Sequence, residues 1–181
     1  MTTHSLKIAS YVDQIHMALS LCEPDLLTAV DLIRQRHRAG RTLWVLGNGG
    51  SLAIAQHFAQ DLVKLGGVRA QALNCPSIIS AYTNDEGFDN AYVMPLNVLR
   101  NPGDLVMIFS CSGKSPNYGK FLTQEDKPDL ISVVGTLGGF LKTNSKVCIH
   151  VKSNDYQVAE TGFNIIADLI VKSFINRSPV K

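Results

Sequence analysis

The segment Trp44-Val45-Leu46-Gly47-Asn48-Gly49-Gly50-Ser51 constrains the fold more strongly than any other part of this chain. It is an apolar run that ends in a glycine-rich turn and a serine. A strand that passes through such a turn into a helix is a building unit of α/β proteins, and the N–H groups at the start of the helix can hold a phosphate. We therefore expect a strand at residues 42–47 and a helix at residues 51–65 that Ser51 caps.

The same alternation of strands and helices continues to the end of the chain. Short apolar runs such as residues 105–109 lack the polar alternation of a half-exposed strand, which is typical of parallel strands buried on both faces. Further strands are expected at residues 70–73, 104–109, 129–135 and 147–151, and helices at residues 77–83, 90–100 and 158–175 and after Pro116. The pattern predicts an α/β fold with a doubly wound, mostly parallel five-stranded sheet.

Two helical patterns precede the first strand. Apolar residues recur at helical spacing over residues 5–22 and over residues 25–38, and Glu23-Pro24 separates the two stretches. A chain of 181 residues with 45% hydrophobic residues is long enough to bury one good core. We expect a single domain over residues 1–181, with a helical hairpin at residues 1–40 and the α/β core at residues 41–181. The hairpin is interpreted as a surface for a partner subunit.

The composition narrows the class of protein. A net charge of +2 and 7% aromatic residues leave no basic, aromatic surface for nucleic acid, so no direct nucleic-acid partner is expected. The four cysteines lack metal-ligand spacing and are interpreted as reduced thiols of a cytoplasmic protein. No apolar run has the length needed to cross a bilayer and the N-terminus lacks a signal-peptide pattern, so no membrane association is expected.

The glycine turn does not match the common nucleotide-binding motifs. In the dinucleotide pattern G-x-G-x-x-G the last glycine is replaced by Leu52, and the P-loop pattern is absent. Binding of NAD or ATP is therefore disfavoured. Taken alone, the turn fits either a close approach of the backbone to a ligand or a tight strand-to-helix turn without one.

A second loop carries hydroxyl groups where the first carries glycines. In Phe109-Ser110-Cys111-Ser112-Gly113-Lys114-Ser115-Pro116-Asn117, three serines surround Gly113, and Pro116 suits the first turn of a helix that Ser115 caps. Hydroxyls together with free N–H groups at a helix start suit a phosphate monoester. An ordinary capped loop is the alternative, and the density of serines beside the glycine turn favours phosphate.

Five stretches extend this pattern along most of the chain. They are Gly47-Asn48-Gly49-Gly50-Ser51, Ala55-Gln56-His57-Phe58-Ala59, Asn84-Asp85-Glu86-Gly87-Phe88, Pro102-Gly103-Asp104 and Ser110-Cys111-Ser112-Gly113-Lys114-Ser115-Pro116-Asn117. In this order they resemble the sugar isomerase (SIS) domain family and, within it, the phosphoheptose isomerases. The resemblance implies a flavodoxin-like SIS fold, a phosphorylated sugar such as sedoheptulose 7-phosphate, and homotetramers with sites at subunit boundaries. The substrate-binding residues that we expect are Asn48, Gly49, Gly50, Ser51, Asn84, Asp85, Ser110, Cys111, Ser112 and Ser115, with Cys111 where a threonine is usual.

The residues for catalysis depart from that family. The resemblance implies a bound zinc, held by a His and a Glu four residues apart on one helix and by a Gln and a His on the last helix. His57 matches the first position, whereas Asp61 replaces the Glu with a side chain shorter by one methylene. Ala159 and Ala167 occupy the other two positions, and neither can bind metal or carry a proton. The candidate catalytic residues are Asp61, His57 and Glu160, and His57 and Asp61 are the remaining candidate metal ligands.

Two functions are compatible with these residues. One is a ketose/aldose phosphate isomerase with Asp61 as base, His57 as acid or metal ligand, and either Glu160 or Asp168 as a second acid. The other is a non-catalytic module that senses a phosphosugar, and the loss of the two groups on the last helix favours it. The sequence leaves open whether a divalent metal binds, and both His57 and Glu160 also fit roles in packing or subunit contact.

Overall fold

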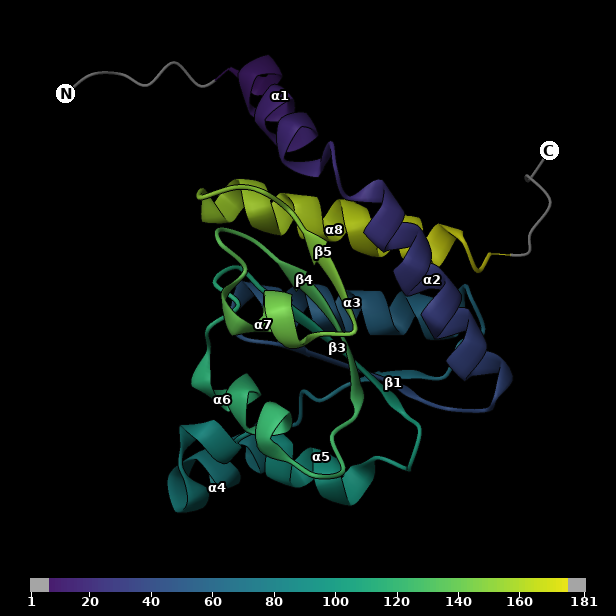
Figure 1. The fold of residues 1–181 in the computed structure, drawn as a ribbon, viewed down its shortest axis with the longest axis vertical. Helices are drawn as coiled ribbons and strands as arrows, with labels where there is room; N and C mark the ends of the chain where they lie inside the picture. Colours follow the sequence, from purple (N-terminus) through teal and green to yellow (C-terminus); the bar gives the residue numbers. More distant parts are fainter. Residues whose placement is uncertain (1–6, 176–181) are drawn as a thin grey trace.

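The computed structural model describes residues 7–175, and its centre is a five-stranded sheet in the order β2-β1-β3-β4-β5 (Figure 1). The strands are β1 (Leu43–Gly47), β2 (Ala70–Ala72), β3 (Leu105–Ser110), β4 (Asp129–Val134) and β5 (Val147–His150). All neighbouring strands run parallel, with Leu43 of β1 opposite Leu105 of β3, for example. The predicted α/β fold with a five-stranded, doubly wound sheet is confirmed.

The direction of strand order reverses between β1 and β3. From β1 the chain passes to β2 on one side of the sheet and then returns to β3 on the other. In open parallel sheets, ligands bind beyond the carboxyl ends of the strands at such a reversal, because the connections from the two central strands diverge there. The glycine turn follows β1 and the serine loop follows β3, so both predicted binding loops leave the sheet at this point.

Helices cover both faces of the sheet (Figure 1). One face packs against α2 (Glu23–Arg38), α3 (Gly50–Lys64) and α8 (Tyr156–Lys172). The other packs against α4 (Pro76–Glu86), α5 (Val93–Leu99), α6 (Pro116–Gly119), α7 (Gly139–Asn144) and the 3₁₀ turns η1 (Phe88–Asn90) and η2 (Lys120–Thr123). Every residue of β1 and β3 is buried, which explains their unbroken apolar sequences. None of the helices in residues 7–175 combines the length and the apolar character that a membrane span requires.

Several helix boundaries differ from the sequence-based prediction, and one helix was not predicted. The helix expected at residues 90–100 is divided, since η1 ends at Asn90 and α5 begins only at Val93. Helix α7 was not predicted, because its six residues are too few to show a helical period. Helix α8 begins two residues early because the Asp155 carboxylate accepts hydrogen bonds from the N–H groups of Gln157 and Val158, at 2.8 and 3.1 Å.

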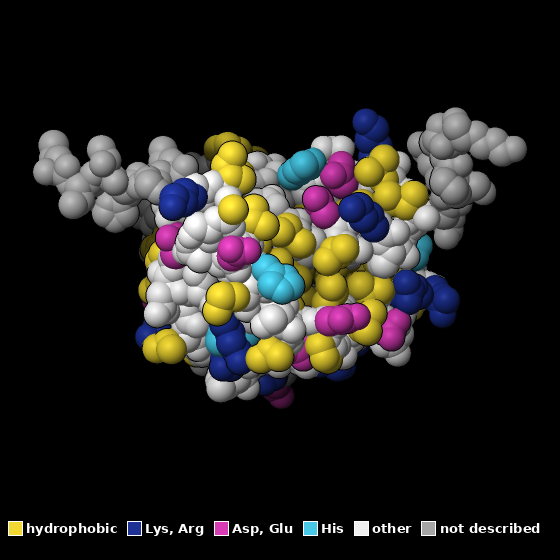
Figure 2. All heavy atoms as spheres, turned by 90° about the horizontal axis from the view of Figure 1, so that it is seen from above, with side chains coloured by type: hydrophobic (Ala, Val, Ile, Leu, Met, Phe, Trp, Pro, Cys, Tyr) yellow, Lys and Arg dark blue, Asp and Glu magenta, His cyan; other side chains and the backbone are white. Residues whose placement is uncertain are grey.

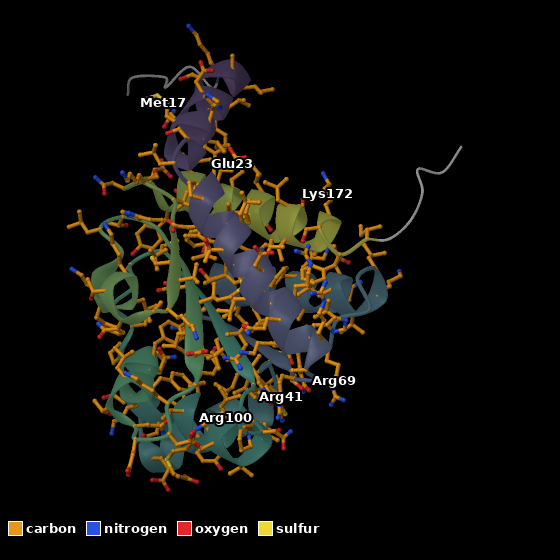
Figure 3. The ribbon with its side chains drawn as sticks, turned by 45° about the vertical axis from the view of Figure 1, so that its right-hand side comes forward. Met17, Glu23, Arg41, Arg69, Arg100 and Lys172 are labelled. Atoms are coloured by element: carbon orange, nitrogen blue, oxygen red, sulfur yellow. The ribbon has the colours of Figure 1, made fainter. Side chains whose placement is uncertain are left out.

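The two N-terminal helices are present, but α1 (Ile8–Leu19) lies against α8 while α2 lies against β5, β1 and α8. Helix α1 leads away from the body of the molecule, and Met17 points outward from it (Figures 1 and 3). Ile8, Val12 and Met17 are 85%, 53% and 73% exposed. Seen from above, this end of the molecule shows hydrophobic side chains gathered in its middle (Figure 2). The apolar sequence of α1 is thus only partly explained by contacts within one chain.

Candidate functional site

A cavity of about 150 Å³ lies where the glycine turn meets the serine loop. We call it the serine pocket. Its lining residues come from three segments of the chain, and they are Asn48, Ser51, Phe109, Ser110, Cys111, Ser112, Ser115, Tyr118, Tyr156 and Glu160. Six of these residues were predicted to bind substrate, and Glu160 was predicted to be catalytic. The fold therefore brings the two loops together as the topology requires.

The glycine turn is shaped by the close approach of its backbone to α3. A Cβ atom on Gly47 would lie 2.3 Å from the carbonyl oxygen of Ser51, so only glycine fits there. Gly49 is the N-cap of α3 and has a φ of 54°, a conformation that favours glycine. The prediction that Ser51 caps this helix was wrong. Ser51 is the second residue of α3, and its hydroxyl donates to Glu160 Oε1 at 3.3 Å.

The serine loop holds its own backbone with its hydroxyl oxygens. Ser110 Oγ accepts from the N–H of Gly113 at 3.1 Å, and Ser112 Oγ accepts from the N–H of Lys114 at 3.2 Å. Because both oxygens act as acceptors, their hydroxyl hydrogens are left to donate to a ligand. Ser115 is the N-cap of α6, as predicted. The loop thus presents O–H donors with little fixed positive charge, which suits a phosphate monoester.

A pair of amides joins the two loops. Asn48 Nδ2 donates to Asn117 Oδ1 at 3.2 Å, and Asn117 Nδ2 donates to Asn48 Oδ1 at 3.0 Å. Asn117 is completely buried. The reciprocal bonds fix the Asn48 side chain relative to the serine loop and leave one hydrogen of its amide for a ligand.

Two stacked tyrosines, Tyr92 and Tyr118, pack next to the glycine turn and the serine loop. The rings of Tyr92 and Tyr118 are nearly parallel, with centroids 5.9 Å apart, and the Tyr92 hydroxyl donates to the carbonyl oxygen of Gly47. Burial raises the pKa of Tyr92 to about 12, so its hydroxyl stays protonated and keeps this bond. Sequence reasoning missed both tyrosines and Asn117. The signal for Asn117 was its position directly after Pro116, at the end of the serine loop.

Glu160 of α8 places a carboxylate beside the start of α3. A Cβ atom on Gly50 would lie 2.8 Å from each of the two carboxylate oxygens, so the absence of a side chain at Gly50 makes room for them. Burial, and then the negative charge of Glu160, raise the pKa of Cys111 to about 11. The Cys111 thiol is therefore protonated at neutral pH and fits its interpretation as a replacement for threonine rather than as a nucleophile.

His57 lies in a neighbouring hollow that shares a wall with the serine pocket. This hollow of about 530 Å³ lies between α3 and α8, with Tyr11 of α1 at its edge, and both Gly50 and Glu160 line it. His57 Nε2 is 3.2 Å from Asp61 Oδ2, and Gln60 Nε2 donates to Asp61 Oδ1 at 3.0 Å. The carboxylate of Asp61 is thus engaged by two neighbours on its own helix, and His57 remains 65% exposed.

The structure does not bring every predicted substrate residue to the serine pocket. Asn84 and Asp85 lie on α4 and are exposed, and Asn84 Nδ2 donates to Asp85 Oδ1 at 2.7 Å. Neither residue lines the serine pocket or the His57 hollow. Gly49 and Gly50 act through the backbone, Gly49 as the N-cap of α3 and Gly50 as the residue over which Glu160 lies.

The described residues do not fit a four-ligand zinc site. Ala159 and Ala167 are buried in the apolar core on the inner side of α8, and His57 and Asp61 pair with each other. Within residues 7–175, His, Cys, Asp and Glu side chains form no group of three or more that could hold a metal ion. The lost ligand positions are therefore not replaced by another cluster in this part of the chain.

Comparisons with known proteins identify the family and several relatives of this chain. The SIS domain model matches residues 8–133. The phosphoheptose isomerase of Geobacter sp. (strain M21) is 34% identical over 159 residues, 81% of this chain and 83% of the relative, and that of Bordetella avium (strain 197N) is 36% identical over 152 residues, 78% and 74%. The solved structure of a phosphoheptose isomerase from Neisseria gonorrhoeae superposes with a TM-score of 0.85 at 25% identity and covers 92% of this chain and 94% of that one. The chain therefore belongs to the SIS domain family.

Proposed function

We propose that this protein binds a sugar phosphate and interconverts its ketose and aldose forms, as an isomerase of the phosphoheptose type with a modified proton-transfer set. The observation that carries the proposal is the position of Glu160, which lines both the serine pocket and the His57 hollow. A ligand with its phosphate at the serines and its sugar chain directed toward His57 has to pass this carboxylate. The intact serine loop and the similarity to phosphoheptose isomerases support the choice of substrate.

In this proposal the serine loop holds the phosphate. Ser110 and Ser112 donate through hydroxyl hydrogens that their own loop leaves free, and Ser115 lines the same pocket at the start of α6. Asn48 lines the same cavity, and its amide keeps one hydrogen that the bond to Asn117 does not use. These neutral donors orient the ligand without a fixed cation, so the sugar end is positioned by the reach of the chain from the phosphate.

Proton transfer then falls to Glu160 and His57. Aldose–ketose isomerisation moves a proton between two adjacent carbons, and a carboxylate beside the sugar can take the proton from one carbon and return it to the next. At the rise of an α-helix, His57 lies about 10 Å along the α3 axis from Gly50, and Asp61 lies about 6 Å beyond His57. We therefore assign Glu160 the role of base and the His57–Asp61 pair the role of acid. The described residues do not fit the zinc of the family, so no step is assigned to a metal.

Turnover of sedoheptulose 7-phosphate tests the enzyme proposal. The purified protein, with and without added Zn²⁺, is expected to produce the aldose phosphate, as followed by NMR. Replacing Ser112 with alanine should weaken sugar-phosphate binding at least tenfold in calorimetry, because one of the hydroxyl donors to a charged group is lost. Binding without turnover of this or other sugar phosphates would refute the isomerase, and undiminished binding by Ser112→Ala would refute the phosphate site.

A non-catalytic phosphosugar sensor is the second candidate. The alanines at positions 159 and 167 favour it, because these buried methyl groups cannot replace a metal ligand or a proton carrier. A sensor would keep the serine pocket and show saturable binding with no isomerisation. The turnover experiment separates the two candidates directly.

The four cysteines are all free, and with either function we place the protein in the reducing cytoplasm.

We also propose that the chain works as a homo-oligomer, specifically a homotetramer. The exposed apolar residues of α1 and the exposed position of His57 beside Tyr11 support subunit contacts at this end of the molecule. Changing Val12 to Glu should shift the molecular mass in light scattering toward smaller species, because the change places a charge in the apolar contact. The matched change Ser10→Glu, on an exposed position of the same helix, should leave the mass unchanged. A wild-type monomer would contradict the proposal.

A further inference from the structure

The hydroxyl of Tyr118 is a buried donor whose role is not explained by the folded chain. Tyr118 is completely buried and lines the serine pocket. Its hydroxyl has no hydrogen-bond partner among residues 7–175. Buried polar groups in native proteins are nearly always hydrogen-bonded, and an unpaired one costs free energy. A donor of this kind in the wall of a binding pocket indicates a group that the ligand satisfies.

The surroundings of Tyr118 hold its ring in place. On one side the ring stacks against Tyr92, whose own hydroxyl is bonded to the carbonyl oxygen of Gly47. The preceding residue, Asn117, is locked to Asn48 by two hydrogen bonds. The position of the Tyr118 hydroxyl is therefore set before any ligand arrives, which lowers the entropic cost of forming a bond to one.

The protonation state of Tyr118 also suits an anionic ligand. Burial, with a smaller contribution from Tyr92, raises the pKa of Tyr118 well above its ordinary value. The side chain is therefore a neutral hydroxyl at neutral pH and can donate a proton to a phosphate oxygen without charge repulsion. Tyr118 also lies only three residues after Ser115, in the short helix that supports the serine loop.

We propose that the Tyr118 hydroxyl donates a hydrogen bond to a phosphate oxygen of the bound sugar phosphate, beside the hydroxyls of Ser110, Ser112 and Ser115. The inference rests on the proposed function, because it adds a donor to the same pocket. The hydroxyl serves the ligand and contributes nothing to the stability of the free protein.

Replacing Tyr118 with phenylalanine tests the claim, because the change removes only the hydroxyl. The affinity for sedoheptulose 7-phosphate and for inorganic phosphate, measured by calorimetry, should fall roughly 10- to 100-fold, the range for hydrogen bonds to charged groups. The melting temperature of the ligand-free protein should stay the same or rise, because no bond is lost. Unchanged affinity for inorganic phosphate would overturn the proposal, even where affinity for the sugar phosphate falls.

The same substitution at Tyr92 is the matched control. Its hydroxyl is bonded to Gly47 within the chain, so Tyr92→Phe should lower the melting temperature of the ligand-free protein, in contrast to Tyr118→Phe. A comparable loss of stability in both variants would show that the Tyr118 hydroxyl has a structural partner, and the proposal would fail. A wild-type protein that binds neither phosphate nor sugar phosphate would instead refute the proposed function itself. Wild-type binding that Tyr118→Phe retains in full refutes only the role of Tyr118.

Discussion

Replacing Glu160 with glutamine should lower the rate of isomerisation at least a hundredfold and tighten the binding of phosphate. Glutamine keeps the shape of the side chain and an oxygen that can accept from Ser51, so the fold is expected to survive. It cannot take up a proton, and general acid–base catalysis typically contributes about 10²–10⁴-fold to a rate. The tighter binding follows because a negative charge is removed from the wall of the pocket that receives an anion.

The measurement pairs NMR turnover of sedoheptulose 7-phosphate with calorimetry of inorganic phosphate. Asp168→Asn is the control, because it removes the same charge from an exposed position two turns farther along α8. It should leave both quantities unchanged. Wild-type turnover by Glu160→Gln would show that another group, with Asp61 as the first alternative, is the base. The expected gain in phosphate affinity holds for the non-catalytic candidate as well, so the experiment is informative for both functions.

Replacing Gly113 with alanine should destabilise the protein by about 3 kcal/mol and abolish phosphate binding. Gly113 has a φ of 62°, and a left-handed conformation costs an alanine about 1 kcal/mol. In addition, a Cβ atom would lie 1.9 Å from the carbonyl oxygen of Gly138, so the serine loop and the segment before α7 have to move apart. Overpacking of this kind costs a further 1–3 kcal/mol, roughly, and displaces the hydroxyls of Ser110 and Ser112.

Gly40 provides the control for backbone strain alone. Its φ of 70° is similar, but within the described part of the chain a Cβ atom there would meet no heavy atom within 4 Å. Gly40→Ala should therefore cost only about 1 kcal/mol in urea denaturation and leave phosphate binding intact. Equal losses of stability in the two variants would contradict the argument that the contact between Gly113 and Gly138 holds the loop in its binding shape.

The sequence was sufficient for the framework of the fold because the framework depends on local patterns. Unbroken apolar runs such as β3 identify strands buried on both faces, and the glycine turn after β1 identifies the start of α3. Local patterns failed for elements that are too short to show a period and for residues whose role depends on a contact with a distant part of the chain. Helix α7 has too few residues for a period, and the role of Ser51 depends on Glu160, which lies 109 residues away.

The residues of the candidate site also fall into those that local sequence predicts and those whose position depends on tertiary packing. The serine loop was predictable, since its residues are adjacent in the chain and its hydroxyls bond to its own backbone. Local patterns do not place Asn84 and Asp85, because the orientation of α4 depends on its packing; both residues lie outside the serine pocket, and their contact with a sugar stays a prediction. Tyr118 was also missed, because an aromatic residue after Pro116 is indistinguishable from an ordinary core residue until its hydroxyl is found without a partner.

Local sequence patterns were enough to predict the sheet, the two loops at its carboxyl edge and the replacement of two expected ligands by Ala159 and Ala167. The folded chain was needed to show that Glu160 lies against Gly50, between the serine pocket and His57, and that Asn117 joins the two loops. The difference comes from how far apart in the sequence the interacting residues lie. Strand burial and loop chemistry follow from neighbouring residues, whereas the meeting of α8 with α3 follows from how their apolar faces pack together on the sheet.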